Sequence, residues 1–189
     1  MRRELHVRFC EGGGVQFPSA TRLVVLCRTA EAAQQALTIV HRWTEAAGLR
    51  LHPEKTHLVD LQHPGGFDFL GYHFERRYRR PRKKSLMKLK NAVRQKTRRT
   101  HGHSLAVIID DLNRTLVGWF GYFKHSHGSF EDLDAWIRTR LRSILRQRAG
   151  FRLRRRAMDH LRWPVRFFAA QGLFSLVQAH VALRQSRRG

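Results

Sequence analysis

An uninterrupted run of basic residues is the part of this sequence with the clearest chemical meaning. Thirteen Lys and Arg residues fall between Arg76 and Arg99, and the nearest acids are Glu75 before the run and Asp110 after it. Ordinary solvated surfaces mix charges of both signs. A stretch of one sign repels itself, whereas a polyphosphate neutralises it and releases counterions on binding. The run therefore predicts a nucleic-acid-binding surface, with RNA and DNA both open as ligands.

A second basic stretch, Arg138–Arg156, contains nine Arg and no acid. Arg binds phosphate oxygens through paired hydrogen bonds, so its excess over Lys favours phosphate contact. Asn113 and His125 are further polar candidates, with capping or a hydrogen-bonded core position as the alternative role. The predicted RNA-binding residues are Arg76, Arg77, Arg79, Arg80, Arg82, Lys83, Lys84, Lys88, Lys90, Arg94, Lys96, Arg98, Arg99, Asn113, His125, Arg138, Arg140, Arg142 and Arg146.

The composition limits the class of protein. A chain of 189 residues that is 42% hydrophobic and has twelve Phe is long and apolar enough for one core or two small ones, despite its net charge of +23. No apolar run approaches the roughly 18 to 20 residues of a membrane span, and no secretory signal is evident. Cys10 and Cys27 lack zinc-type spacing, as do the twelve His. We expect free thiols, no metal cofactor and a cytoplasmic location.

The first part of the chain predicts a small βαββ unit over residues 22–75. Residues 1–21 show no lasting period and are expected to be irregular. Leu23–Cys27 has the composition of a buried strand, and strand signals return within residues 49–61 and 67–74. Between them, Thr29 can cap a helix that ends at Gly48. The residues predicted to line the inner face of this helix are Ala33, Ala36, Leu37, Val40, Trp43 and Ala47.

After a charged connector at residues 76–84, the pattern turns helical, which makes the fold class α+β. Residues 85–150 predict a helical domain whose first two helices are capped by Ser85 and Ser104, and Ser129–Asp132 resembles a capping box. Residues 151–189 predict a basic helical extension, broken at Trp163-Pro164. Trp119, Tyr122 and Phe123 could stack on RNA bases, but their helical spacing favours a core role.

Several blocks of this sequence resemble the reverse transcriptases encoded by bacterial group II introns. His52–Thr56 and Phe67–Tyr72 resemble the later polymerase blocks of that family. Leu112–Ser126 resembles its maturase-specific motif, as does Phe130–Trp136 together with the Arg-rich helix behind it. The blocks occur in order across residues 22–185.

The resemblance implies roles for the two parts of the chain. Residues 22–75 would be the C-terminal end of the polymerase palm. Residues 85–150 would be the thumb and maturase region, which binds structured intron RNA and the primer–template and helps the intron to splice. Gly71 would allow a close backbone approach between palm and thumb, and Tyr72 would pack in the core.

The catalytic metal site of the family is not present in this sequence. Relatives carry a Tyr-Ala-Asp-Asp turn before the strand that matches Leu23–Cys27, and its acids bind the metal ions of nucleotide transfer. Here Ser19-Ala20-Thr21-Arg22 occupies that turn. The resemblance therefore implies no polymerase activity for this chain alone, and Mg²⁺ only if a partner supplies the acids. Lys55 matches a lysine near the incoming nucleotide, but a solvated lysine is the favoured interpretation.

Three hypotheses follow. The first is a maturase-like protein that binds structured group II intron RNA and assists splicing. The second is the C-terminal part of a split RNA-directed DNA polymerase, completed by a separate N-terminal half. The third is a non-functional remnant that aggregates through exposed apolar surface. Because the resemblance begins abruptly near Arg22, we also hypothesise that the residues before it are out-of-frame sequence.

Overall fold

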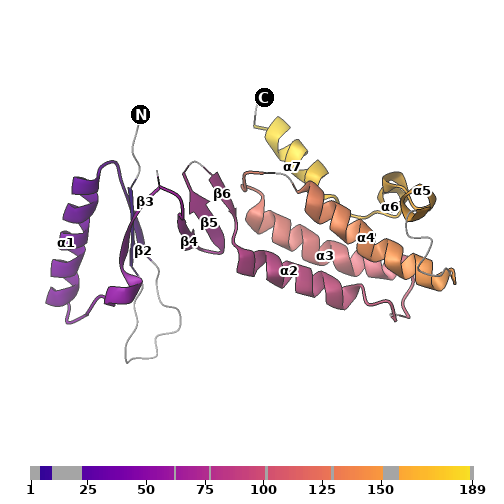
Figure 1. The fold of residues 1–189 in the computed structure, drawn as a ribbon, viewed down its shortest axis with the longest axis horizontal. Coiled ribbons are helices and arrows are strands. Elements are labelled where there is room, and N and C mark those ends of the chain that lie inside the picture. Colours follow the sequence, from indigo (N-terminus) through magenta and orange to yellow (C-terminus); the bar gives the residue numbers. More distant parts are fainter. Residues whose placement is uncertain are drawn as a thin grey trace. The chain divides into compact units, whose positions relative to one another are not determined.

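The computed structural model describes residues 5–9, 23–61, 63–76, 78–100, 102–128, 130–150 and 158–187, and the side chains from Leu23 onward. The chain divides into two compact units, residues 1–80 and residues 81–189 (Figure 1). The first unit holds two small sheets and one α-helix, and the second is helical. The predicted α+β class is confirmed.

A three-stranded antiparallel sheet in the order β2-β1-β3 organises the first unit. Its strands are β1 (Leu5–Phe9), β2 (Leu23–Cys27) and β3 (His57–Asp60). The expected irregular start is therefore wrong for residues 5–9, which pair with both neighbours: Leu5 lies opposite Cys27 and opposite Asp60. Their alternation of apolar and polar residues is typical of a strand. Cys10 and Ser19–Arg22 lie outside the described residues.

Helix α1 (Ala30–Ala46) covers this sheet after the predicted cap: the Thr29 hydroxyl accepts a 3.1 Å hydrogen bond from the Ala32 amide. Ala33 is fully buried with Val25, Leu37 and their neighbours. Trp43 was expected to face inward but is 66% exposed. A 17-residue helix is about 25 Å long, whereas strands of four or five residues reach only about 17 Å, so the apolar stripe extends past the sheet.

The second sheet, in the order β4-β5-β6, corrects one expectation. Its strands are β4 (Phe67–Phe69), β5 (Tyr72–Glu75) and β6 (Tyr78–Pro81). Residues 78–81 of the expected connector 76–84 therefore form a strand. Gly71 (φ +79°) and Leu70 (φ +44°) form the two-residue turn of a hairpin, in which both central residues need positive φ. A close backbone approach occurs at Gly66, where a Cβ atom would lie 2.0 Å from the Phe74 carbonyl oxygen.

The second unit is built on three long helices that lie side by side (Figure 1). Their shared core includes Leu112, Leu116, Leu141 and Ile144, each 0% exposed. The long helices are α2 (Lys83–Lys96), α3 (Leu105–Phe123) and α4 (Glu131–Arg148). The short helices that follow are α5 (Asp159–Arg162), α6 (Val165–Ala170) and α7 (Leu176–Gln185), and η1 (Pro53–Lys55) is a 3₁₀ turn of the first unit.

The predicted helix starts of this unit hold at one position and fail at others. The Ser104 hydroxyl caps α3 by accepting from the Val107 amide at 3.3 Å, as predicted. Ser85 does not cap α2, which begins two residues earlier behind Arg82. Phe130, rather than a hydroxyl residue, occupies the capping position of α4, where its 7% exposed ring packs into the core; Ser129 lies outside the described residues.

Two polar side chains form hydrogen bonds that hold the N-terminal end of α7 and the loop before it. The carboxylate of Asp134, 4% exposed, accepts hydrogen bonds from the Ser175 hydroxyl (2.7 Å) and from the Leu176 and Val177 amides (3.1 and 3.3 Å). Asn113 donates to the Gly172 carbonyl at 2.7 Å and accepts from the Phe174 amide at 2.8 Å. These bonds satisfy amides that a helix start leaves without partners.

The aromatic side chains of α3 divide between core and surface. Phe123 is buried and its ring centroid lies 4.7 Å from that of Trp119, which also meets Phe130 edge-on. Tyr122 is 52% exposed. The core role is therefore confirmed for Phe123 and, in part, for Trp119, and it is wrong for Tyr122. In the described parts of the chain, no helix is both long and apolar enough to cross a bilayer.

We expect Asp134→Ala to lower the free energy of unfolding by about 2 kcal/mol, because it removes a buried charged acceptor shared by three donors. Asp132→Ala is the matched control: it removes the same charge from the same first turn of α4, but from an exposed position, and should cost less than about 1 kcal/mol. Urea denaturation measures both. Equal losses for the two variants would contradict this role for Asp134.

His180 of α7 makes this unit sensitive to acid. Its ring is buried against Phe130, with centroids 5.1 Å apart. Burial lowers the pKa of His180, and the nearby Arg184 and His127 lower it further. The unfolded chain therefore binds the proton first, so stability falls as the pH drops below about 6.5. Thermal unfolding between pH 8 and pH 5.5 should show a smaller decrease for His180→Leu than for the wild type.

The exposed His160 provides the control for this measurement, because His160→Leu removes a histidine that is not buried. That variant should keep the pH dependence of the wild type. If His180→Leu and the wild type lose stability in parallel as the pH falls, the buried imidazole is not the group responsible.

Candidate nucleic-acid interface

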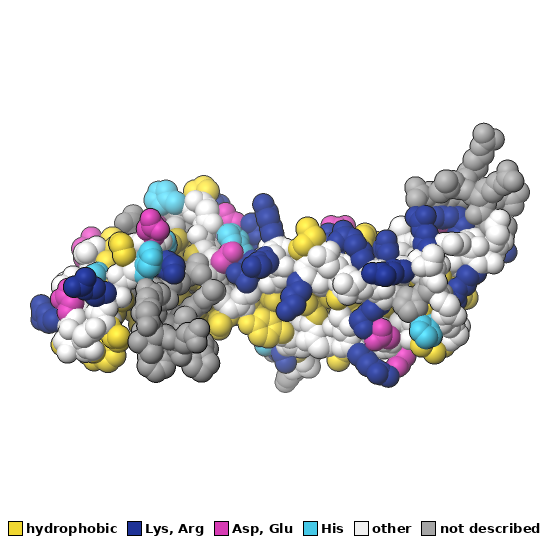
Figure 2. Space-filling view, turned by 90° about the horizontal axis from the view of Figure 1, so that it is seen from below, with side chains coloured by type: hydrophobic (Ala, Val, Ile, Leu, Met, Phe, Trp, Pro, Cys, Tyr) yellow, Lys and Arg dark blue, Asp and Glu magenta, His cyan; other side chains and the backbone are white. Residues whose placement is uncertain are grey.

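The positive charge of the chain is concentrated in the second unit. Residues 81–189 contain 25 Lys and Arg against 6 Asp and Glu, which places +19 of the net +23 there. On the face of this unit that Figure 2 shows, Lys and Arg side chains are spread along the helices and acidic side chains are sparse. This unit is therefore the part of the chain whose charge favours binding of a polyanion.

Most acids of this unit are already engaged. Asp111 binds Lys96 at 2.5 Å, and Asp110 binds Arg114 at 2.6 Å on the next turn of α3. Asp159 pairs with Arg146 and Asp134 caps α7. Four of the six carboxylates thus neutralise three cations in total, so the unit keeps a large excess of positive charge on its surface.

Helix α2 separates its apolar and basic residues cleanly. Leu89 and Val93 are 3% and 0% exposed on the inner side. The outer side and the turn behind the helix carry exposed cations, namely Lys83, Lys84, Lys88, Arg94, Arg98 and Arg99. This division follows the spacing of the residues, because apolar residues three or four apart fall on one face of a helix.

Two cations of α2 lie over one aromatic ring of α4. The Lys90 ammonium and the Arg94 guanidinium carbon lie 5.8 and 5.7 Å from the ring centroid of Trp136 on α4. Arg94 also donates to the Asn91 side-chain oxygen at 2.7 Å. Such contacts restrict the guanidinium to few orientations without neutralising its charge.

Arg140 joins α4 to the end of α2. Its Nε donates to the Thr97 hydroxyl at 3.0 Å, and its Nη2 donates to the carbonyl oxygens of Thr97 (2.9 Å) and Arg94 (3.4 Å). Burial lowers the pKa of Arg140, and the positive charges of Arg94 and Arg99 lower it further. An arginine stays protonated even so, and its head is therefore a cation beside two other cations.

Two further arginines of α4, Arg142 and Arg148, form contacts within the fold. Arg142 donates to the Trp163 carbonyl at 3.0 Å and lies over the ring of Phe168. Burial lowers the pKa of Arg142, as does the charge of Arg138, while Asp159 raises it. Arg148 donates to the His103 carbonyl.

Arg146 corrects the sequence prediction. It is 6% exposed and forms a buried ion pair with Asp159, so it belongs to the core of the unit and not to a phosphate-binding surface. No sequence pattern distinguishes Arg146, because all the arginines of α4 follow one another at short spacing in one acid-free run.

The other residues that the sequence predicted to bind RNA either belong to the first unit or form hydrogen bonds elsewhere in the second unit. Arg76, Arg79 and Arg80 belong to the first unit, where Arg80 binds Glu75 at 3.2 Å. His125 Nδ1 lies 2.9 Å from the Arg187 guanidinium, and Asn113 bonds the loop before α7, as described above. Arg77 and Arg152–Arg156 lie outside the described residues. Sequence reasoning missed Thr97 and Ser143, whose hydroxyls hold Arg140 and Arg99.

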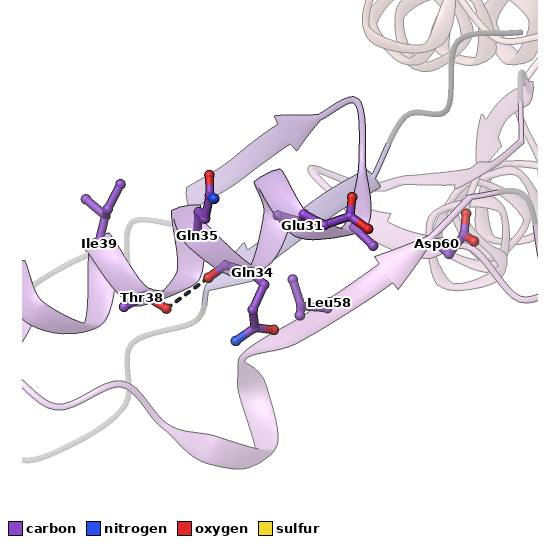
Figure 3. Close-up of a pocket in the computed structure, with 9 residues that line it drawn as sticks. Glu31, Gln34, Gln35, Thr38, Ile39, Leu58 and Asp60 are labelled. Carbon is purple, nitrogen blue, oxygen red and sulfur yellow. Dashed lines mark hydrogen bonds between the residues drawn. The ribbon is translucent and has the colours of Figure 1, made fainter.

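A cavity in the first unit has a different chemistry. It is an open hollow of about 950 Å³ between α1 and β3 (Figure 3). Ile39 and Leu58 form part of its lining, and the carboxylates of Glu31 and Asp60 also lie along it. An apolar wall with acidic groups does not suit a polyphosphate. No group of three or more potential metal ligands occurs among the described residues.

Comparison with known families identifies part of the second unit. Residues 86–163 match the family described as the group II intron, maturase-specific domain. The match begins within α2 and ends just after α5, so it contains Arg94, Arg99 and Arg140. This stretch is therefore similar to the maturase-specific domain. A search of curated proteins found no match to the chain.

We expect Asp159→Leu to lower the free energy of unfolding by about 3 to 5 kcal/mol, because it leaves the buried Arg146 charge without its partner. Adding Arg146→Met should recover most of that loss, since the pair is then replaced by apolar groups. Urea denaturation of the single and double variants measures the difference.

Asp110→Ala is the control, because it breaks an exposed ion pair and should change the unfolding free energy by only about 0 to 1 kcal/mol. If the single and double variants at the buried pair were equally unstable, the loss would come from packing and not from an unpaired charge.

Proposed function

We propose that this protein binds structured group II intron RNA and assists its splicing, without polymerase activity of its own. The observation that carries the proposal is the coincidence of two features: the maturase-specific match spans residues 86–163, and most of the chain's net charge lies in the same unit. RNA helices are recognised mainly by shape and phosphate contacts, which a surface of spaced cations can provide.

The absence of polymerase activity rests on the sequence. Ser19-Ala20-Thr21-Arg22 stands where the related reverse transcriptases carry metal-binding acids. Thr21 offers only a neutral hydroxyl, and Arg22 would repel Mg²⁺. The proposed role is therefore that of an RNA-binding partner that stabilises the folded intron, with no cofactor of its own.

A second candidate function is the C-terminal part of a split polymerase. The first unit favours it, because Leu26 of β2 and two residues of α1, Ile39 and Trp43, are 65% or more exposed. The outer strands of its small sheet, β2 and β3, are also open edges within the described residues. Exposed apolar surface and open edges are typical of a missing partner. Primer extension that appears only when a separately produced N-terminal reverse-transcriptase half is added would identify this function.

The main test is binding to folded group II intron RNA and to duplex DNA of similar length across a salt series. We expect the RNA to bind more tightly at moderate salt, and splicing of that RNA at limiting Mg²⁺ to be faster with the protein. Lys84→Gln, Lys88→Gln and Arg98→Gln together should lower the salt slope by about 2 to 3, because each lost phosphate contact removes roughly 0.7 to 0.9.

The matched control removes three exposed arginines of the first unit, Arg28→Gln, Arg42→Gln and Arg50→Gln, and therefore changes the net charge equally. It should leave the preference for intron RNA and the splicing rate intact. Equal binding of RNA and DNA, lost together as salt rises, would contradict the proposal. Aggregation of the wild-type chain in RNA-free buffer would favour a non-functional remnant.

A further inference from the structure

We propose that Arg94, Arg99 and Arg140 form a discrete anion site that holds one phosphate group, filled in the RNA complex by a backbone phosphodiester. The site lies where the C-terminal end of α2 meets the middle of α4. The identity of its natural ligand rests on the RNA binding proposed above, whereas the anion site itself can be tested without RNA.

The three guanidinium groups are brought together along one stripe of α4. Trp136, Arg140 and Ser143 occupy positions i, i+4 and i+7 of that helix and therefore share a face. Arg94 lies over the first, and the Arg99 Nε donates to the hydroxyl of the third at 3.2 Å. Arg140 stands between them, bonded to the backbone of the last turn of α2.

Neutral atoms hold all three groups in place. Arg140 bonds the hydroxyl and carbonyl of Thr97 and the carbonyl of Arg94, and Arg94 bonds the Asn91 amide oxygen. Among the described residues, no carboxylate forms an ion pair with Arg94, Arg99 or Arg140. The carbonyls at the end of α2 offset only about half a charge. Most of the charge of the cluster therefore remains uncompensated.

Three other cations of the unit are paired with carboxylates. Lys96, Arg114 and Arg146 each have an aspartate within bonding distance. Burial lowers the pKa of Arg140 most, and repulsion by the positive charges of Arg94 and Arg99 lowers it further. A bound anion would relieve this repulsion, because it adds the negative charge that the cluster lacks.

A phosphate fits this arrangement better than a single carboxylate. Each guanidinium presents a planar fork of donors, and a phosphate offers oxygen acceptors in several directions to more than one fork at a time. Thr97 is 0% exposed and bonds the Val93 carbonyl as well as Arg140, so the central guanidinium is anchored to a rigid part of the core. Such a group needs little ordering when the anion arrives.

Thermal unfolding of the full chain in inorganic phosphate, compared with sodium chloride of equal ionic strength, tests the site directly. Phosphate bound to the folded state should raise the wild-type Tm above its value in chloride. Arg94→Gln with Arg99→Gln should remove at least about half of that difference, because the two exposed guanidinium groups of the site are lost. Arg140 is left intact in this variant because it also joins α2 to α4.

Arg166→Gln with Arg184→Gln is the control, because both arginines are exposed in the same unit but lie on α6 and α7. It should keep the full phosphate effect. No difference between phosphate and chloride for the wild type, or an equal loss in both double variants, would overturn the anion site.

The RNA arm of the experiment separates this inference from the proposed function. With intron RNA, the Arg94/Arg99 double variant should lower the salt slope by about 0.7 to 0.9, as expected for one phosphate. A lost phosphate effect with an unchanged RNA slope would overturn the assignment of the site to RNA. If the wild type shows the phosphate effect but no preference for intron RNA, the anion site stands and the proposed function fails.

Discussion

Electrostatic self-repulsion is the constraint on which the second unit of this protein depends. A net charge of +19 within 109 residues opposes compaction, so the apolar core has to offset it. The core formed by α2, α3 and α4 includes several fully buried leucines and isoleucines, and α6 and α7 add Phe168 and Leu176. Burial of such side chains stabilises a fold by about 1.5 to 3 kcal/mol each. The acids contribute locally, where Asp134 and Asp159 hold α7 and α5 in place.

The bonding partners of each cation determine whether its charge is neutralised within the fold or can still attract a ligand. Arg146 lies inside the unit, where only a carboxylate partner can compensate for the loss of water. Arg140 lies nearer the surface and bonds carbonyl and hydroxyl oxygens, which fix its position and leave most of its charge to act outward. A count of arginines in the sequence treats these two residues alike. Their partners in the fold distinguish them.

Local signals were predictable from the sequence, and features that depend on distant residues were not. Thr29 and Ser104 cap their helices as predicted, because a cap involves only residues three positions away. The strand at Leu5–Phe9 was missed, because its partners lie about twenty and fifty residues later in the chain. The burial of Arg146 likewise depends on Asp159, beyond the end of α4.

Two glycines and one aromatic residue also show that contacts with distant residues cannot be predicted from local sequence patterns. The sequence placed a special backbone requirement near Gly71, and positive φ is indeed needed there, but for a hairpin turn. Gly66, five residues earlier, also makes a tight contact with a strand that folds back on it, and no local pattern indicated that contact. Trp43 fits the apolar period of α1, yet the short sheet leaves it uncovered. Periodicity shows which residues share a face, whereas burial also depends on the size of the opposing surface.

Fixed and mobile cations also differ in what they can recognise. Lys84 and Lys88 are exposed on long flexible side chains, which attract any polyanion and adapt to it at an entropic cost. Arg94, Arg99 and Arg140 are held by a ring, by hydroxyls and by backbone carbonyls, so their spacing is set before a ligand binds. A fixed spacing favours phosphates that are themselves held at fixed positions, as in a folded RNA, over those of a flexible strand. Selectivity for structured RNA can thus arise from side-chain anchoring, without contacts to individual bases.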